Sequence, residues 1–238
     1  MERIKKILLV MLILGMVITV PCYDDTSQLM EVAAKMSGKR TIVIDPGHGG
    51  FDGGAQSESG VPEKDINLSI AKELEKLLKK KGFRVRMTRE SDTALGHTES
   101  STIRSRKTAD LNERKKIIDE ESPLLTVSIH LNSFKEDRSV RGAQVFYPEE
   151  DTDKKTGSRA LAESVQKELI KGLDDGTERS VLPKNDIRLM KDIKTPIIII
   201  ECGFLSNYEE AKLLVKEDYQ KKTALCIYKG IVKFVKLK

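Results

Sequence analysis

The 238-residue sequence has no tryptophan, only 5% aromatic residues, and just three cysteines and three histidines. Three cysteines cannot form a disulfide framework, so the fold has to depend on a hydrophobic core, for which 39% hydrophobic residues suffice. The 42 basic and 37 acidic residues are mixed along the chain, and no arginine-rich stretch with interleaved aromatics is present. Nucleic-acid binding is therefore disfavoured, and the net charge of +5 is typical of a solvated surface.

The amino terminus has the pattern of an export signal. Basic residues within positions 1–6 precede an unbroken apolar run at 7–20, and polar sequence follows. The run is shorter than the roughly 17–25 residues of a membrane-spanning helix. No clear small-residue cleavage site follows it, so an uncleaved anchor is the alternative. We expect residues 1–38 to be a signal peptide or N-terminal anchor with a linker, and residues 39–238 to be one folded domain.

Short apolar runs alternate with segments of helical periodicity through the rest of the chain. Runs rich in Val and Ile are typical of strands buried on both faces, and this alternation is typical of βαβ units. The sequence therefore predicts an α/β fold. The predicted strands are residues 41–45, 84–88, 124–129, 143–147, 196–200 and an edge strand at 187–190; the predicted helices are 65–81, 111–118, 159–173, one opened by a capping box of Ser206 and Glu209, and one through 224–235.

Residues 91–110 interrupt this alternation. They are polar, rich in Ser and Thr, and have no apolar periodicity. We expect a mobile loop, because the segment has no apolar face to bury. His97 lies inside it, and a lone histidine in such a loop is usually solvated, so we do not count it as a ligand.

Three side chains that can bind a metal, His48, His130 and Glu201, come at or just after the ends of predicted strands. In open α/β sheets the carboxyl ends of the strands form the ligand crevice. Two imidazoles and a carboxylate should therefore meet at one edge of the sheet, and this combination predicts a metal site.

Zinc at a catalytic site takes three protein ligands and leaves one position for water. His48 and His130 supply two ligands, and Glu63, at the start of the helix after a glycine-rich turn, is the best candidate for the third. Two histidines and one glutamate form a known catalytic zinc set. Glu201 can then act as general base to the water and later as acid to the leaving amine.

Each of these residues also has a purely structural interpretation. His48 can pack against the glycine-rich turn, His130 can cap a strand end, and Glu63 is favoured at a helix start by the dipole. Glu201 after four isoleucines is harder to explain, because a buried carboxylate costs several kcal/mol unless it is paired. Cys202 should point to the opposite face from Glu201, as a small buried hydrophobe rather than a nucleophile.

Four segments carry a resemblance to a known family. They are DPGHGG at 45–50, EKD at 63–65 with Asn67, SIHLNS at 128–133, and ECGFLSN at 201–207. Over residues 39–238 the chain resembles the zinc-dependent N-acetylmuramoyl-L-alanine amidases, whose four motifs appear here in order.

The resemblance implies a single catalytic domain with a twisted mixed, largely parallel β-sheet that is flanked by helices on both faces. It also implies one zinc ion per chain, a catalytic carboxylate and neighbouring polar contacts to the ligands or substrate. The corresponding residues are His48, Glu63 and His130 as zinc ligands, Glu201 as the catalytic carboxylate, and Asp45, Asn67 and Asn132 as candidate contacts.

One departure from the family pattern is visible. The family's Arg-Asp segment, here TRESD at 88–92, is normally followed closely by a Leu-x-x-Arg helix start. Here that start, LNER at 111–114, is delayed by the polar residues in between. This puts the conformation of the insertion in doubt and leaves the zinc motifs intact.

The chain carries a leader and a catalytic domain without wall-binding repeats, an arrangement similar to the germination-specific cortex amidases of spore-forming bacteria. That resemblance implies removal of stem peptides from peptidoglycan in spore cortex, ahead of muramic lactam formation, by an enzyme exported to the cell wall or cortex space. We also expect an accessory protein. The alternatives are a catalytically weak peptidoglycan-binding domain and a zinc peptidase that cuts within the stem peptide.

Overall fold

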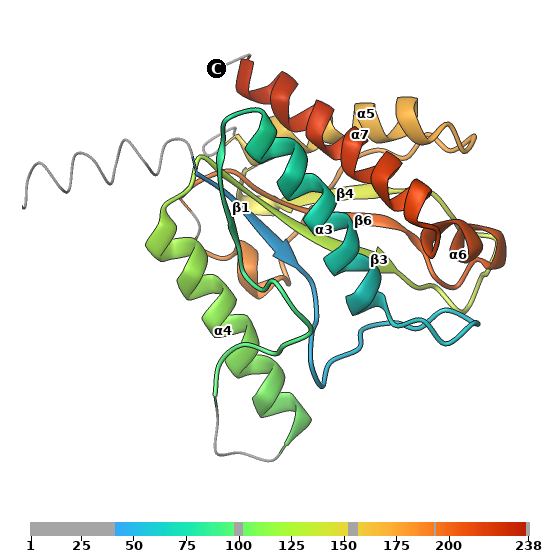
Figure 1. The fold of residues 1–238 in the computed structure, drawn as a ribbon, viewed down its shortest axis with the longest axis horizontal. Helices are drawn as coiled ribbons and strands as arrows, with labels where there is room; N and C mark the ends of the chain where they lie inside the picture. The colour runs from blue at the N-terminus through green and yellow to red at the C-terminus, as the bar shows by residue number, and fades with distance from the viewer. Residues whose placement is uncertain (1–40, 98–101, 152–156, 193, 237–238) are drawn as a thin grey trace, which may run out of the picture. The chain divides into compact units, whose positions relative to one another are not determined.

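The computed structural model describes residues 41–97, 102–151, 157–192 and 194–236. Strands and helices alternate through most of this part of the chain, as Figure 1 shows. The elements are β1 (Thr41–Pro46), α3 (Glu63–Lys80), β2 (Arg84–Met87), α4 (Ile103–Glu121), β3 (Leu125–Asn132), β4 (Gln144–Pro148), the 3₁₀ helix η1 (Glu149–Asp151), α5 (Ser158–Leu173), β5 (Leu182–Lys184), the 3₁₀ helix η2 (Arg188–Met190), β6 (Ile197–Phe204), α6 (Tyr208–Leu214) and α7 (Glu217–Lys236).

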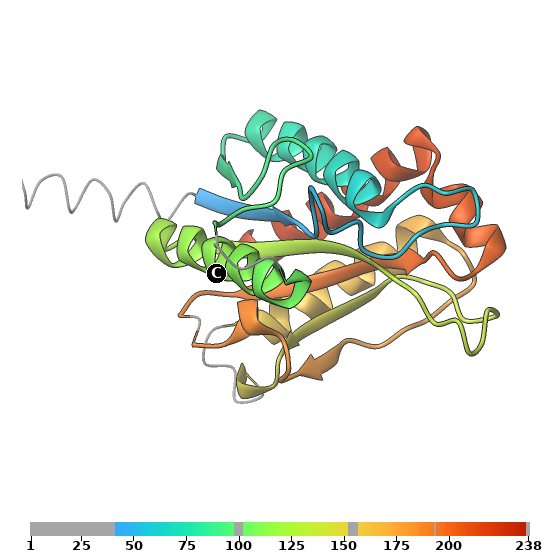
Figure 2. The same cartoon turned by 90° about the horizontal axis from the view of Figure 1, so that it is seen from below.

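The strands form one six-stranded sheet in the order β2-β1-β3-β6-β4-β5. All neighbouring pairs are parallel except β4 and β6, which are antiparallel. The prediction of a mixed, largely parallel sheet is therefore confirmed. Figure 2 shows helices on both sides of this sheet.

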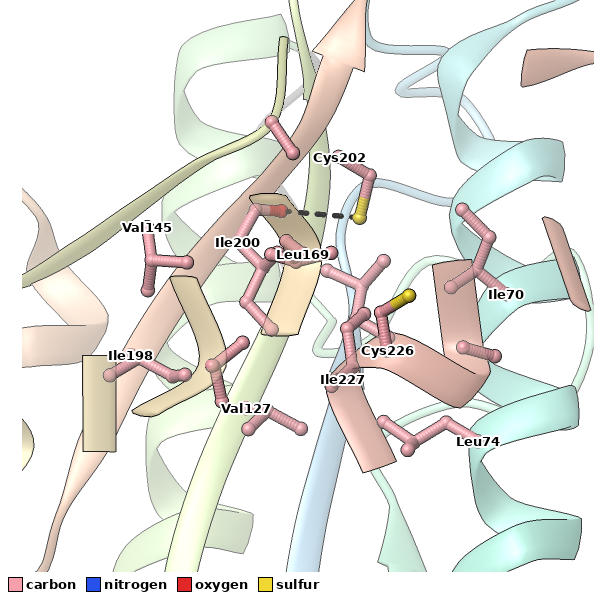
Figure 3. Packing of buried hydrophobic residues seen from close by; sticks show 14 of the residues in the cluster. Ile70, Leu74, Val127, Val145, Leu169, Ile198, Ile200, Cys202, Cys226 and Ile227 are labelled. Carbon is pink, nitrogen blue, oxygen red and sulfur yellow. Dashed lines mark hydrogen bonds between the residues drawn. The ribbon is translucent and has the colours of Figure 1, made fainter. Parts of the chain in front are cut away.

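Alternate residues of the central strands point to two different cores. On one face, Ile198, Ile200 and Cys202 of β6 join a large cluster with side chains of α3, α5, α6 and α7. We call this the three-helix face, after α3, α5 and α7. Figure 3 shows Cys202 and Cys226 within it, and both are free thiols. The prediction that Cys202 is a small buried hydrophobe is confirmed.

The other face of the sheet has a smaller apolar cluster, and we call it the α4 face. Seven buried hydrophobic residues form the cluster, contributed by β1, α4, β4, η2 and β6: Val43, Ile118, Phe146, Leu189, Met190, Ile197 and Ile199. Because side chains alternate along a strand, residues 45, 128, 130 and 201 lie on this same face. The α4 face thus carries most of the polar residues that the sequence marks as candidates.

The prediction of a loop through residues 91–110 is wrong for its second half, because α4 begins at Ile103. Thr102 caps the helix by accepting a hydrogen bond from Ser105 N. The helix has almost no amphipathic character, so apolar periodicity could not reveal it. His97 is exposed, as expected for a solvated histidine, and residues 98–101 lie outside the described part.

Two smaller predictions are also wrong. Residues 188–190 form a 3₁₀ helix rather than an edge strand, because Leu189 and Met190 are buried in the α4-face cluster instead of pairing with a strand. The edge strand beside β4 is β5, which contains Pro183, a residue tolerated at a sheet edge. The N-cap of α6 is Asn207 instead of Ser206, and its side chain accepts from Glu210 N.

Candidate metal centre

The glycine-rich turn after β1 presents His48 in a left-handed conformation, with φ of 61°. Two glycines clear the space around the side chains that gather here. A Cβ atom on Gly47 would lie 2.2–2.6 Å from atoms of the His130 ring, and one on Gly54 would lie 2.5 Å from Glu63 Oε2. The turn is therefore shaped to the histidine and glutamate side chains, and any larger residue at either position would displace them.

The predicted ligands His48, Glu63 and His130 do come together. Glu63 Oε1 lies 3.2 Å from His48 Nε2 and 3.1 Å from His130 Nδ1. One ligand atom from each residue lies within 4.8 Å of the other two. The two imidazole rings meet edge to face, with centroids 5.0 Å apart. Two imidazole nitrogens and one carboxylate oxygen at this spacing fit a zinc ion.

Glu63 is fixed in place by its own hydrogen bonds. It is the first residue of α3, and its Oε2 accepts from Ala55 N while its Oε1 accepts from Leu131 N. Burial would raise the pKa of Glu63, but hydrogen bonds from His130 and His48 hold it far below its usual range. The carboxylate is thus charged and oriented toward both imidazoles.

His48 also contacts a second carboxylate, which the sequence analysis missed. Its Nδ1 lies 2.9 Å from Asp52 Oδ2, on the side of the ring away from Glu63. Burial lowers the pKa of His48, but hydrogen bonds to Asp52 and Glu63 raise it to about 9. The cluster is therefore held together by charge as well as by packing.

Glu201 lies beside this cluster, on β6. It is paired with His130 of β3 in the parallel register, so the two side chains project from the same face of the sheet. The Oε2 atom of Glu201 is buried and has no hydrogen-bond partner among the described residues. Burial raises the pKa of Glu201, opposed by the charge of His130. A buried carboxylate oxygen left free next to three metal-binding side chains is available for a proton.

The buried ion pair of Asp45 and Arg114 supports the glycine-rich turn. Asp45 Oδ1 accepts from Arg114 Nη1 at 2.7 Å, and Arg114 Nη2 donates to the backbone oxygen of His48 at 2.6 Å. Thr88 and Ser128 hydroxyls also donate to Asp45. Burial would raise the pKa of Asp45, but the Arg114 charge and these hydrogen bonds lower it to about 2. Asp45 thus holds the backbone of His48 through Arg114, and its hydrogen-bond partners are Thr88, Arg114 and Ser128.

The remaining predicted contacts divide in two. Asn67 Nδ2 donates to Glu63 Oε1 at 3.1 Å and to Gly47 O at 3.3 Å, so this residue orients the glutamate. Asn132 Oδ1 accepts from Ser133 N, and among the described residues no hydrogen bond joins its side chain to the three donors. Asn67 therefore belongs to the cluster, whereas Asn132 lies at the end of β3.

In the sequence Arg114 stands out only as part of a family segment, although in the fold it is among the most buried side chains. Arg89 has a comparable role, since its guanidinium donates to Pro46 O and Gly47 O. The two arginines hold the carbonyl oxygens of the glycine-rich turn. Their motif positions were a signal, but their partners are distant in sequence and could not be inferred.

Comparisons with known proteins agree with this geometry. The family pattern described as Amidase_3, N-acetylmuramoyl-L-alanine amidase, matches residues 42–233. A germination-specific N-acetylmuramoyl-L-alanine amidase of Bacillus subtilis is 41% identical over 199 residues, which cover 84% of this chain and 81% of that protein.

Solved structures show the same similarity. The CwlD amidase of Clostridioides difficile, in complex with the GerS lipoprotein, superposes with a TM-score of 0.79 at 42% identity, covering 84% of this chain and all of that one. An N-acetylmuramoyl-L-alanine amidase of Clostridium difficile 630 gives a TM-score of 0.72 at 32% identity, covering 84% and 99%.

Proposed function

The chain belongs to the Amidase_3 family of N-acetylmuramoyl-L-alanine amidases, and we propose that His48, Glu63 and His130 bind one zinc ion while Glu201 is the catalytic acid and base. The reaction hydrolyses the amide bond between N-acetylmuramic acid and L-alanine of peptidoglycan. The donor set supports the first part of this proposal, and the free buried oxygen of Glu201 is the single observation that carries the second.

A zinc ion bound by these three residues would polarise the carbonyl and acidify water at the site. Glu201 takes a proton from the water while the water oxygen attacks the lactyl carbonyl carbon. The carbon–nitrogen bond then breaks, and Glu201 returns the proton to the nitrogen of L-alanine. The products are a lactyl carboxylate and a free amino group. The register of Glu201 beside His130 supports this role, because it puts the carboxylate on the same face of the sheet as a proposed zinc ligand.

The sequence leaves two alternatives to the amidase function. A catalytically weak peptidoglycan-binding domain has no need of a buried, unpartnered carboxylate oxygen, and Glu201 provides one. A zinc peptidase acting within the stem peptide would use the same donor set. Mass spectrometry of digested peptidoglycan separates all three: free lactyl carboxyls with released L-alanine amino termini indicate the amidase, cuts between stem residues indicate the peptidase, and unchanged fragments indicate binding alone.

The spore-cortex role is also part of our proposal. It is supported by the 41% identity to a protein named as a germination-specific amidase. In this role the enzyme removes stem peptides from muramic acid before muramic lactam forms. Deleting the gene in its host should leave cortex without muramic lactam, and muropeptide analysis of purified spores tests this. Wild-type lactam content after deletion would contradict the role.

Acting on peptidoglycan places the enzyme outside the cytoplasm, and we propose that residues 1–38 direct its export or anchor it, with residues 39–238 as the catalytic domain. The compact unit that includes the sheet runs from Ser37 to Lys238, which supports this boundary. Among the described helices, none is long and apolar enough to cross a membrane. Residues 1–40 lie outside the described part.

We also propose an accessory protein. A tethered partner would raise the effective concentration of the hydrolase at its substrate, and it could favour the zinc-competent state of the site. The related CwlD amidase was solved with a lipoprotein, which supports the idea. The test is the activity of purified residues 39–238 on peptidoglycan with zinc supplied. Full, zinc-saturated activity without a partner would remove the need for one.

A further inference from the structure

The two nitrogens of His48 face different carboxylates. Its Nε2 lies 3.2 Å from Glu63 Oε1, inside the donor cluster, whereas its Nδ1 lies 2.9 Å from Asp52 Oδ2, outside it. A carboxylate accepts a hydrogen bond, so the proton of the neutral ring belongs on Nδ1 and the lone pair on Nε2. That arrangement leaves the nitrogen facing the cluster free to bind a cation.

Asp52 is itself held by the polar insertion that precedes the family's helix start. Its Oδ1 lies 2.9 Å from the Nζ atom of Lys107, which is in the first turns of α4. One residue earlier, Phe51 lies under the guanidinium of Arg106, 3.9 Å from the ring centroid. Two consecutive residues of α4 therefore contact two consecutive residues of the glycine-rich turn. The insertion reaches the metal centre through this pair of contacts.

We propose that Asp52 is a positioning residue that sets the ring orientation and tautomer of His48, and that Lys107 fixes Asp52 from α4. The inference rests on the zinc site of the proposed function. Carboxylates that accept the second N–H of a ligating histidine fix its orientation and raise its basicity, and their loss typically costs about 10–100-fold in metal affinity. Lys107 is half exposed, so its contribution is smaller.

His130 provides an internal contrast. Its Nδ1 faces Glu63, and among the described residues no side chain forms a hydrogen bond with its Nε2. Instead, its ring packs directly over Gly47, which has no side chain to displace it. Packing thus orients one histidine and a hydrogen-bonded carboxylate orients the other. Replacing Asp52 should therefore affect His48 and leave His130 unchanged.

The experiment compares zinc affinity in Asp52→Ala, Asp52→Asn, Lys107→Ala and the control Lys116→Ala, using the full chain and competition with a chromophoric chelator. Lys116 lies on the same helix, but its ion pairs are with Glu113 and Glu120 on the surface. We expect a loss of about tenfold or more for Asp52→Ala, a smaller loss for Asp52→Asn, which keeps an acceptor oxygen, and a few-fold loss for Lys107→Ala. Lys116→Ala should match the wild type.

A second readout separates positioning from a general loss of structure. The chain has three histidines, so the ¹⁵N spectrum of the imidazoles can be assigned by substitution. In zinc-loaded wild type, the Nδ1–H proton of His48 should be protected from exchange, and Asp52→Ala should lose that protection while the His130 signals stay in place.

Unchanged zinc affinity in Asp52→Ala, or weaker binding with the His48 Nδ1–H still protected, would overturn the proposal. If Asp52→Ala fails to fold, Asp52→Asn and Lys107→Ala decide by the same two readouts. A wild-type chain that binds no zinc would instead count against the proposed function, so the two failures are distinguishable.

Discussion

The two faces of the sheet differ in what they bury: one buries mainly apolar side chains, and the other also buries charged groups. On the three-helix face, α3, α5 and α7 cover the strands with a large apolar cluster. On the α4 face the apolar cluster has seven buried residues, and beside it lie the Asp45–Arg114 pair and the unpartnered oxygen of Glu201. Apolar burial dominates the stability of folded proteins. The first face therefore stabilises the domain, and this frees the second to hold buried charge.

This contrast extends to the carboxylates themselves. Glu201 and Glu210 are both carboxylates whose pKa is raised by burial. Glu210 accepts hydrogen bonds from Phe204 N and Gly142 N, whereas one oxygen of Glu201 has no partner within the described residues. The satisfied carboxylate of Glu210 fits a structural role, and the unsatisfied oxygen of Glu201 beside metal-binding side chains is the reason we propose a catalytic role for it. The two buried carboxylates thus differ in their hydrogen bonding.

The largest effect should come from removing a ligand on the functional side. His48→Ala or His130→Ala should lose bound metal and activity together, because two remaining protein ligands hold zinc poorly. Elemental analysis of the purified protein, run beside an activity assay, measures both. Stoichiometric zinc in either variant would exclude that histidine from the ligand set.

The next effect tests whether the α4 face depends on its buried ion pair. Arg114→Met leaves the Asp45 carboxylate buried without its counter-charge, which should cost about 3–5 kcal/mol of unfolding free energy. Urea unfolding gives the value. Arg104→Met, on the exposed part of the same helix, should cost little. A loss below about 1 kcal/mol for Arg114→Met would show that the pair does not support the turn.

A substitution in the core of the three-helix face should lower stability and leave zinc content and turnover unchanged. Leu74 is fully buried between α3 and the sheet, and Leu74→Ala should lower stability by about 2–5 kcal/mol through lost burial and a cavity. Below its unfolding transition the variant should keep wild-type zinc content and turnover. Thermal unfolding combined with the same two assays checks this, and lost zinc in a folded variant would break the separation between the faces.

The smallest effect concerns Glu210. Burial raises its pKa to about 7, against two backbone hydrogen bonds that favour the carboxylate. Between about pH 4.5 and 7 the folded state keeps a proton that the unfolded state has released, so this group makes stability fall as pH rises, by roughly 1–3 kcal/mol. Glu210→Gln should flatten that slope. Urea unfolding at pH 5 and pH 7 measures it, since other titrating groups cancel between the variants; equal slopes would contradict the assignment.

The sequence was sufficient to predict most of the fold and the centre of the site. His48, His130 and Glu201 could be placed because each follows the apolar run of a buried strand, although β3 and β6 continue beyond His130 and Glu201 to Asn132 and Phe204. The period of two along a strand also predicted that Cys202 turns away from Glu201. Glu63 could be placed because it opens the helix that follows the glycine-rich turn. In each case a local pattern determines the position.

What could not be predicted depends on contacts between distant residues. The first turns of α4 have no apolar side, and the helix start at Ile103 is instead stabilised by the Thr102 cap and by the ion pair of Lys107 with Asp52. Arg114 and Asp45 are 69 positions apart, and no local pattern links them. Lys107 and Asp52 are likewise brought together only by the fold. Charged pairs of this kind leave little trace in a single sequence.

In the proposed mechanism, Glu201 carries the proton in amide hydrolysis while His48, Glu63 and His130 hold the metal. The most direct test is Glu201→Gln, which keeps the shape of the side chain and removes its ability to transfer a proton. Turnover on peptidoglycan, zinc content and unfolding should be measured on the same preparation. We expect zinc and stability near wild type with a loss of about 10²–10⁴-fold in turnover. Near wild-type turnover with zinc bound would show that Glu201 is not the base.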